Sequence, residues 1–195
     1  MTKKILPATA MILAFSLGIA LSQDKGGGKG KGPAGPGMTL TSPDFQDGGI
    51  IPDKYSQKGG QMGPSPELEW TNVPMGVQSF VLLFHDPDVA LQKKLDDVTH
   101  WMAFNIPGAA RKLAGGVSAD AKLPDGTIQI KNTRNNVGYM GPGAPAAGPH
   151  HHYTFELFAL DTKLDLTDTA TRADVMKAMD GHILAKAVLE GRFHQ

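Results

Sequence analysis

The sequence predicts a mainly β domain over residues 38–195. From Met38 onward, short apolar or alternating runs are separated by Gly, Pro, Asn and Asp, a pattern typical of strands and turns. Helix signals are confined mainly to the C-terminal part of the chain. The full chain has 41% hydrophobic and 19% charged residues, which suits a globular protein, and residues 38–195 have the size of one domain with a single core.

Residues 1–22 have the layout of a secretory signal peptide. Lys3 and Lys4 precede an apolar run over residues 5–21, and small residues stand three and one positions before a cleavage point after Ser22. An uncleaved anchor is the alternative, and it is disfavoured because the run is at the short limit for spanning a bilayer. We therefore expect an exported protein, periplasmic or extracellular, with no stable membrane insertion after signal cleavage.

Residues 23–37 are expected to be a disordered Gly/Lys-rich spacer, because they cannot bury apolar surface. The chain has 19 basic and 19 acidic residues, and Lys3 and Lys4 belong to the export segment, so acidic groups are in excess in the remainder. Nucleic acid is therefore not an expected partner. The absence of cysteine means that the core alone must hold the domain, and it excludes thiol catalysis.

Three apolar runs are the strongest strand candidates. The first covers Ser79 to His85 and is stopped by Pro87; the second, His100 to Ile106, ends at a Pro-Gly pair; the third, His151 to Leu160, is rich in aromatic and aliphatic residues. Each is bounded by residues that favour turns. We expect these runs to supply much of the sheet structure.

The C-terminal part carries the helix signals. A capping box is indicated at Thr171–Asp174, and apolar residues follow at helical spacing: Val175, Met179, Ile183 and Leu184. We expect Gly181 to divide this stretch into two short helices. Residues 109–149 hold many turn formers and are expected to form long surface loops, which in a small domain often carry function.

Asp86 and Asp88 flank Pro87 directly after the first strand candidate. Because proline lacks an N–H group and restricts its own φ angle, the strand must end there and present both carboxylates at its mouth. A simple Asp-Pro turn with solvated carboxylates is the alternative interpretation.

Histidines begin the other two strand candidates. Strand alternation places His151 and Tyr153 on one face with Phe155 and Leu157, and His150 and His152 on the other face. The face with the large apolar residues is expected to point inward. Alternation likewise places His100 on an apolar face of its own strand, with Met102, Phe104 and Ile106. A histidine so placed is either a group that binds a ligand or a core residue whose ring nitrogens are hydrogen-bonded within the protein.

A loop rich in glycine and proline lies between these strands at residues 138–145. Its glycines permit close approach of the backbone, and N–H groups exposed in such a turn can hold an anion. An ordered surface loop without a ligand is the alternative.

Five motifs in order carry a resemblance to a known family. They are Ser65-Pro-Glu-Leu-Glu-Trp70, Asp86-Pro-Asp88, His100-Trp101, Gly138-Tyr-Met-Gly-Pro142 and His151-His-Tyr-Thr-Phe-Glu-Leu-Phe-Ala-Leu-Asp161. Over residues 38–193 the chain resembles the phosphatidylethanolamine-binding family, in its bacterial Raf-kinase-inhibitor-like branch. The resemblance implies two antiparallel sheets in a Greek-key-like β-sandwich with a few short peripheral helices.

The same resemblance implies a small mouth that accepts phosphate-like or other anionic groups. The matching positions are Asp86, Asp88, His100, Gly141, Pro142, His151 and Tyr153. The chain departs from the family at Gly143, where a cysteine is common, and at Phe193, where tyrosine is common. The triple histidine leaves two choices for the second pocket histidine, His150 and His151, and the register of Tyr153 favours His151.

Carboxylates beside histidines favour the charged imidazolium, so this acidic site is expected to hold an anion on histidine and backbone donors. The leading hypothesis is a non-enzymatic binding protein for a small anionic or phosphorylated ligand, without a cofactor or metal. A second is an inhibitor that docks onto an unknown protein partner, a kinase or protease. A third is a metal-dependent enzyme such as a hydrolase, because histidines and aspartates are metal ligands.

Overall fold

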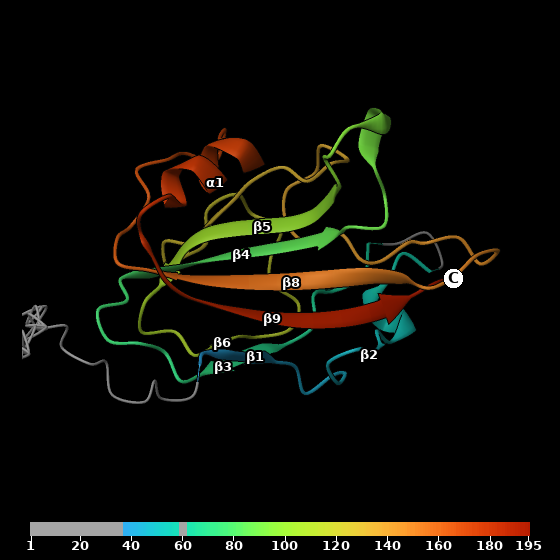
Figure 1. Ribbon diagram of the computed structural model, residues 1–195, viewed down its shortest axis with the longest axis horizontal. Helices are drawn as coiled ribbons and strands as arrows, with labels where there is room; N and C mark the ends of the chain where they lie inside the picture. Colours follow the sequence, from blue (N-terminus) through green and yellow to red (C-terminus); the bar gives the residue numbers. More distant parts are fainter. Residues whose placement is uncertain (1–36, 59–61) are drawn as a thin grey trace, which may run out of the picture. The chain divides into compact units, whose positions relative to one another are not determined.

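Two β-sheets enclose the main core in the computed structural model, which describes residues 37–58 and 62–195 (Figure 1). The smaller sheet has the order β1-β3-β6, from Thr39–Thr41, Leu68–Thr71 and Lys112–Leu113. The larger sheet has the order β2-β9-β8-β4-β5-β7. Its strands are Gly49–Ile50, Ile183–Phe193, His151–Leu160, Ser79–Asp86, Val98–Pro107 and Ile128–Gln129.

All pairings are antiparallel except β2 with β9. Mainly β structure in two sheets confirms the predicted fold class.

The three predicted strands lie side by side at the centre of the large sheet, in the order β8, β4 and β5. β8 has the predicted bounds, while β4 and β5 extend slightly beyond theirs. β4 is buried on both faces over Ser79–Phe84, which explains why its sequence is a continuous apolar run rather than an alternating one.

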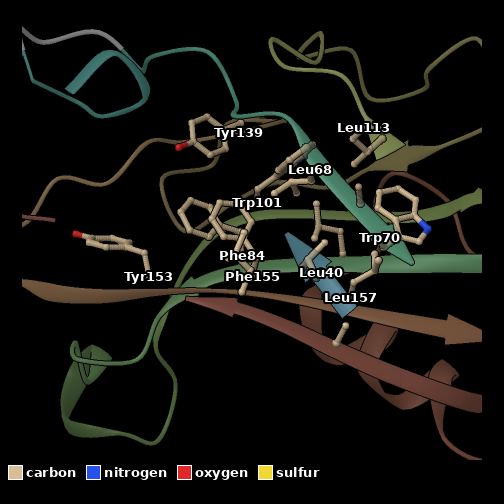
Figure 2. Close-up of a cluster of buried hydrophobic side chains, with 14 of the residues drawn as sticks. Leu40, Leu68, Trp70, Phe84, Trp101, Leu113, Tyr139, Tyr153, Phe155 and Leu157 are labelled. Atoms are coloured by element: carbon tan, nitrogen blue, oxygen red, sulfur yellow. The ribbon is translucent and has the colours of Figure 1, made fainter. Parts of the chain in front are cut away.

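The main core lies between the two sheets and is rich in aromatic side chains. Phe84 of β4 stacks on Phe155 of β8 with ring centroids 3.9 Å apart, and on Tyr139 with centroids 5.4 Å apart (Figure 2). Leu40 and Trp70 of the small sheet close the same cluster from the other side. Tyr153 lies at one end of the cluster and points its hydroxyl group away from it (Figure 2).

Helix α1, Arg172–Met179, covers the opposite face of the large sheet (Figure 1). Its capping box is formed as predicted, because Thr171 and Asp174 bond to each other's backbone N–H groups. Val175 and Met179 bury the helix against a second apolar cluster on this face. Two single-turn 3-10 helices, η1 at Asp53–Tyr55 and η2 at Leu91–Lys93, complete the helical structure of the described residues.

The prediction of a second C-terminal helix is wrong. Gly181 adopts a φ of 81° and ends the helical segment, and the chain then forms the long strand β9, which pairs with β8. Four alternating positions of β9 face the core: Ala187, Leu189, Gly191 and Phe193. Ile183 and Leu184, which suggested a helix, are exposed. Pairing along the whole of β8 therefore outweighs a short apolar repeat at helical spacing.

Residues 109–149 are mostly loops, as predicted, but they are not confined to the surface. The Gln129 side chain is fully buried: its oxygen accepts from Trp101 Nε1 at 2.6 Å, and its nitrogen donates to the carbonyl oxygens of Ser118 and Asp120, each at 2.7 Å. One buried amide thus satisfies three polar groups from two other segments, which lets this irregular chain pack against β5.

A polar cluster ties α1 to the outer face of the large sheet. Asp97, which precedes β5, accepts hydrogen bonds from Arg172 of α1 and from His85 Nδ1 of β4, the latter at 2.7 Å. Partial burial alone would raise the pKa of Asp97, but the hydrogen bonds from Arg172 and His85 outweigh it and lower the pKa below its usual value.

Replacing Asp97 by asparagine is expected to reduce the free energy of unfolding at neutral pH by about 2 kcal/mol, because charge-assisted hydrogen bonds are lost. A carboxylate with a lowered folded pKa stabilises the fold above its unfolded pKa of about 3.9, and the stabilisation is lost as the pH falls through the folded value. The difference from wild type should therefore shrink in acid. Urea unfolding across pH, with the exposed Asp96→Asn variant as control, measures this; a difference that is constant with pH would contradict it.

The export segment predicted at residues 1–22 and the spacer predicted at residues 23–37 lie outside the described residues, apart from Gly37. In the part of the chain that is described, none of the helices has the length and apolar character needed to cross a bilayer.

Candidate functional site

Three strands of the large sheet bring four of the predicted residues to one cavity of 310 Å³. Asp86 ends β4, His100 lies at the start of β5, and His151 and Tyr153 begin β8. Because β4 is antiparallel to both neighbours, its end and their starts meet at the same edge of the sheet. Residues far apart in the sequence therefore line the same cavity.

Asp86 and His151 form the central pair of the site. The carboxylate is almost completely buried; one oxygen accepts from the backbone N–H of Asp88 at 3.0 Å, and the other lies 2.8 Å from His151 Nδ1. Because a carboxylate accepts, Nδ1 carries a proton in this pair, and Nε2 is left for a ligand. Burial of Asp86 and the turn at Pro87 thus hold the His151 ring in one orientation. His150 lies outside the cavity lining, and its ring packs at a tilt against that of His194, with ring centroids 3.8 Å apart.

His100 reaches the cavity through a β-bulge. Phe84 pairs with Trp101 and His85 pairs with Thr99, so His100 is an extra residue without an opposite partner. Its ring therefore packs beside the rings of Phe84 and Tyr153, each with centroids 5.2 Å away.

The bulge overturns the predicted face of His100. Met102 and Phe104 belong to the cluster under α1, on the opposite face of the sheet from Phe84 and Tyr153, whereas Ile106, beyond a second irregularity of the β4–β5 pairing, lies in the main core. Simple alternation fails here because one inserted residue shifts the register by one position.

His100 also departs from the expected imidazolium. Its Nδ1 lies 2.8 Å from the carbonyl oxygen of Met140, so Nδ1 carries the proton and the neutral ring has an accepting lone pair at Nε2. Burial lowers the pKa of His100, and the hydrogen bond to Met140 and the charge of Asp86 do not offset it. Near neutral pH the His100 ring is thus uncharged and adds no positive charge to the site.

The Gly-Pro loop does not offer the free backbone donors that its sequence suggests. Gly143 and Ala144 donate their N–H groups to the Tyr153 hydroxyl oxygen at 3.2 and 3.0 Å. The N–H groups of Met140 and Gly141 donate to the carbonyl oxygens of His100 and Met62. These four N–H groups are therefore already used inside the protein.

Gly141 and Pro142 stand behind the cavity lining rather than in it. The carbonyl oxygen of Gly141 accepts from Gln57 Nε2 at 2.6 Å, and that of Pro142 accepts from Gln57 N at 2.8 Å. Both residues therefore position the loop from which Gly143 and Ala144 hold Tyr153. Burial raises the pKa of Tyr153 to about 12, so its hydroxyl remains protonated and neutral.

Asp88 lies near the cavity, outside its lining, and is paired with His152, the third histidine of the triplet. Its Oδ2 accepts from the backbone N–H of His152 at 2.6 Å and lies 2.9 Å from His152 Nδ1. Partial burial alone would raise the pKa of Asp88, but these two hydrogen bonds outweigh burial, so the pKa lies below its ordinary value. Asp88 thus orients His152 as Asp86 orients His151.

Several residues of the cavity were missed by sequence reasoning. Gln57, Thr133 and Arg134 add polar groups, while Val89 and Leu91 add an apolar wall. No local pattern marks them, because they come from three separate segments that converge only through the fold. Arg134 is the largest omission, since it brings a permanent positive charge.

Asp86, Asp88 and His151 offer potential metal ligand atoms within 4.8 Å of one another. Carboxylate oxygen and imidazole nitrogen suit Zn²⁺ and similar ions. In the present arrangement, however, His151 Nδ1 is directed at Asp86 and Asp88 Oδ2 is bonded to His152. A cation there would have to displace a proton from His151 and rearrange both pairs.

Comparison with known proteins gives consistent similarities. The family model for phosphatidylethanolamine-binding protein matches residues 41–194. A UPF0098 protein of Methanothermobacter thermautotrophicus is 39% identical over 81% of this chain and 99% of its own length. The UPF0098 protein YbhB of Escherichia coli is 34% identical over 80% of this chain and 99% of its own length.

Two solved structures share the fold. CT736 of Chlamydia trachomatis, described as a phosphatidylethanolamine-binding protein homologue, has a TM-score of 0.71 and 34% identity, covering 82% of this chain and 98% of its own. YbcL of Escherichia coli, described as a member of the mammalian family of that name, has a TM-score of 0.73 and 26% identity, covering 82% and 99%.

Proposed function

Because this chain belongs to the phosphatidylethanolamine-binding protein family, we propose that it is a non-enzymatic, exported binding protein whose cavity holds a small anion, either phosphate or a phosphorylated headgroup. The export part of the proposal depends on the basic and apolar pattern of residues 1–22. The ligand part depends on the cavity at the edge of the large sheet.

The observation that carries the ligand proposal is the orientation of His151. Buried Asp86 holds its Nδ1 at 2.8 Å, and the ring lines the cavity. Tyr153 and Gln57 add neutral polar groups to the same space, while Val89, Leu91, Val98 and Met140 give the lining an apolar part. A few convergent polar groups in a small, partly apolar cavity suit a small polar ligand group attached to a less polar body.

A His151→Ala variant is expected to bind phosphate at least about 10-fold more weakly than wild type, because hydrogen bonds to charged groups contribute about 1.5–3 kcal/mol. Isothermal titration calorimetry with inorganic phosphate, phosphoethanolamine and acetate measures this. His150→Ala is the matched control, since that histidine lies outside the lining, and its affinity should equal that of wild type.

Removal of the imidazole leaves one carboxylate oxygen of Asp86 without its hydrogen-bond donor. Urea unfolding of His151→Ala and His150→Ala is therefore measured in parallel, and His151→Gln serves as a less disruptive replacement. The proposal fails if the wild-type protein binds none of these anions. It also fails if folded His151→Ala and His151→Gln proteins bind them as tightly as wild type.

A further inference from the structure

Arg134 stands at the tip of a short hairpin, residues 131–137, which is organised around a buried asparagine. Asn132 Oδ1 accepts from the N–H groups of Arg134 and Asn136 at 3.0 and 3.2 Å, and Asn132 N donates to the carbonyl oxygen of Asn136 at 2.8 Å. Asn135 takes a φ of 65°, a conformation that asparagine tolerates better than most residues. The turn is therefore closed by its own hydrogen bonds.

The hairpin is fastened to β5 directly beside His100. Thr133 N donates to the carbonyl oxygen of Thr99 at 3.0 Å, and Thr99 N donates to Thr133 Oγ1 at 2.8 Å. These two bonds fix the backbone next to Arg134 against the start of the strand. Arg134, which is exposed to solvent, lines the cavity from this position.

The charge of Arg134 is not neutralised by the protein. Among the described residues that line the cavity, it is the only lysine or arginine, and its guanidinium makes no ion pair or hydrogen bond with another described residue. The nearby carboxylates of Asp86 and Asp88 are directed at His151 and His152. Arg134 also contributes to the low pKa of His100, which is consistent with a guanidinium charge close to that ring.

We propose that Arg134 is the anion-selecting residue of this cavity, and that it makes the cavity prefer a dianionic phosphomonoester to a monoanionic phosphodiester or carboxylate. The inference rests on the proposed anion-binding function and adds the ligand class. Coulomb attraction scales with the charge of the ligand, so a dianion gains about twice as much from one fixed cation. The planar guanidinium can also form two parallel hydrogen bonds with phosphate oxygens.

The test is calorimetric titration of the full chain with methyl phosphate, dimethyl phosphate and acetate at about pH 7.5, above the second pKa of about 6 for phosphomonoesters. Wild type should bind methyl phosphate most tightly. Arg134→Gln should weaken methyl phosphate binding by about 10-fold or more, and weaken the two monoanions by a smaller factor. Lys131→Gln removes the same charge from the same hairpin but from a residue outside the lining, and should leave all three affinities unchanged.

Arg134→Lys should retain only part of the methyl phosphate affinity, because lysine keeps the charge but lacks the planar guanidinium that can donate two parallel hydrogen bonds. If wild type binds methyl phosphate and Arg134→Gln binds it equally well, the role of Arg134 is refuted while the anion cavity stands. Tighter wild-type binding of dimethyl phosphate would refute the dianion preference and point to a lipid-like phosphodiester. If wild type binds no anion, the proposed function and this inference fail together.

Discussion

Replacement of Phe84 by alanine is expected to lower the free energy of unfolding by about 3–5 kcal/mol, the range for large aromatic truncations in cores. The ring is fully buried at the centre of the main core. It stacks on Phe155 with centroids 3.9 Å apart and an interplanar angle of 10°, and it also packs on Tyr139. Since domains of this size are stable by about 5–15 kcal/mol, this one change would remove a large part of the total.

The same replacement should disturb the cavity, because Phe84 is the surface against which His100 and Tyr153 pack, with ring centroids 5.2 and 6.1 Å away. Urea unfolding followed by circular dichroism measures the stability change. Phe84→Leu should cost clearly less, because a leucine refills part of the cavity that alanine leaves. Leu95→Ala, at a fully exposed leucine, should change stability by less than about 0.5 kcal/mol. A Phe84→Ala protein as stable as the Leu95→Ala control would show that the aromatic cluster is not the stabilising core.

The second large effect is expected at Gly141. A Cβ atom there would overlap the carbonyl oxygen of Tyr55 and lie 2.8 Å from the Cα of Ser56, and both neighbours are backbone rather than flexible side chain. Gly141→Ala should therefore destabilise the protein by about 2–3 kcal/mol through overpacking. The loop must also shift away from η1, which would break the bonds from Gln57 and move Gly143 and Ala144 off the Tyr153 hydroxyl.

Gly148→Ala is the matched control, because a Cβ at that glycine meets nothing within 4 Å and its φ is not positive. The free energy of unfolding of this variant should be within about 0.5 kcal/mol of that of wild type. Thermal unfolding of both variants and titration with phosphate measure the two consequences separately. If Gly141→Ala were as stable as Gly148→Ala and bound phosphate as wild type does, the close contact with η1 would have no structural role.

Much of the fold could be predicted because the relevant patterns are local. β4 is a continuous apolar run that ends at Pro87, and β8 alternates so regularly that the inward position of Tyr153 and Phe155 follows from counting. The capping box at Thr171 and Asp174 is likewise contained in four consecutive residues. Such patterns need no knowledge of what packs against them.

The errors have a shared cause: each involves a partner on a different element of the fold. Ile183 and Leu184 suggested a helix, whereas β9 forms because β8 offers a complete pairing edge. His100 was assigned to the wrong face because its bulge is defined against β4. The N–H groups of Gly143 and Ala144 looked available as donors because their acceptor, the Tyr153 hydroxyl, lies on β8.

By itself the sequence determined the class of fold, the three central strands and the residue types at the mouth, since side-chain periodicity and turn chemistry act over a few neighbouring positions. The tertiary structure alone decided which groups carry charge there. Burial lowers the pKa of His100, a hydrogen bond with Asp86 orients the His151 ring, and a hairpin bonded to Thr99 places Arg134 at the cavity. Solvation and Coulomb energy depend on distances in space between groups tens of residues apart, and chain order does not contain those distances.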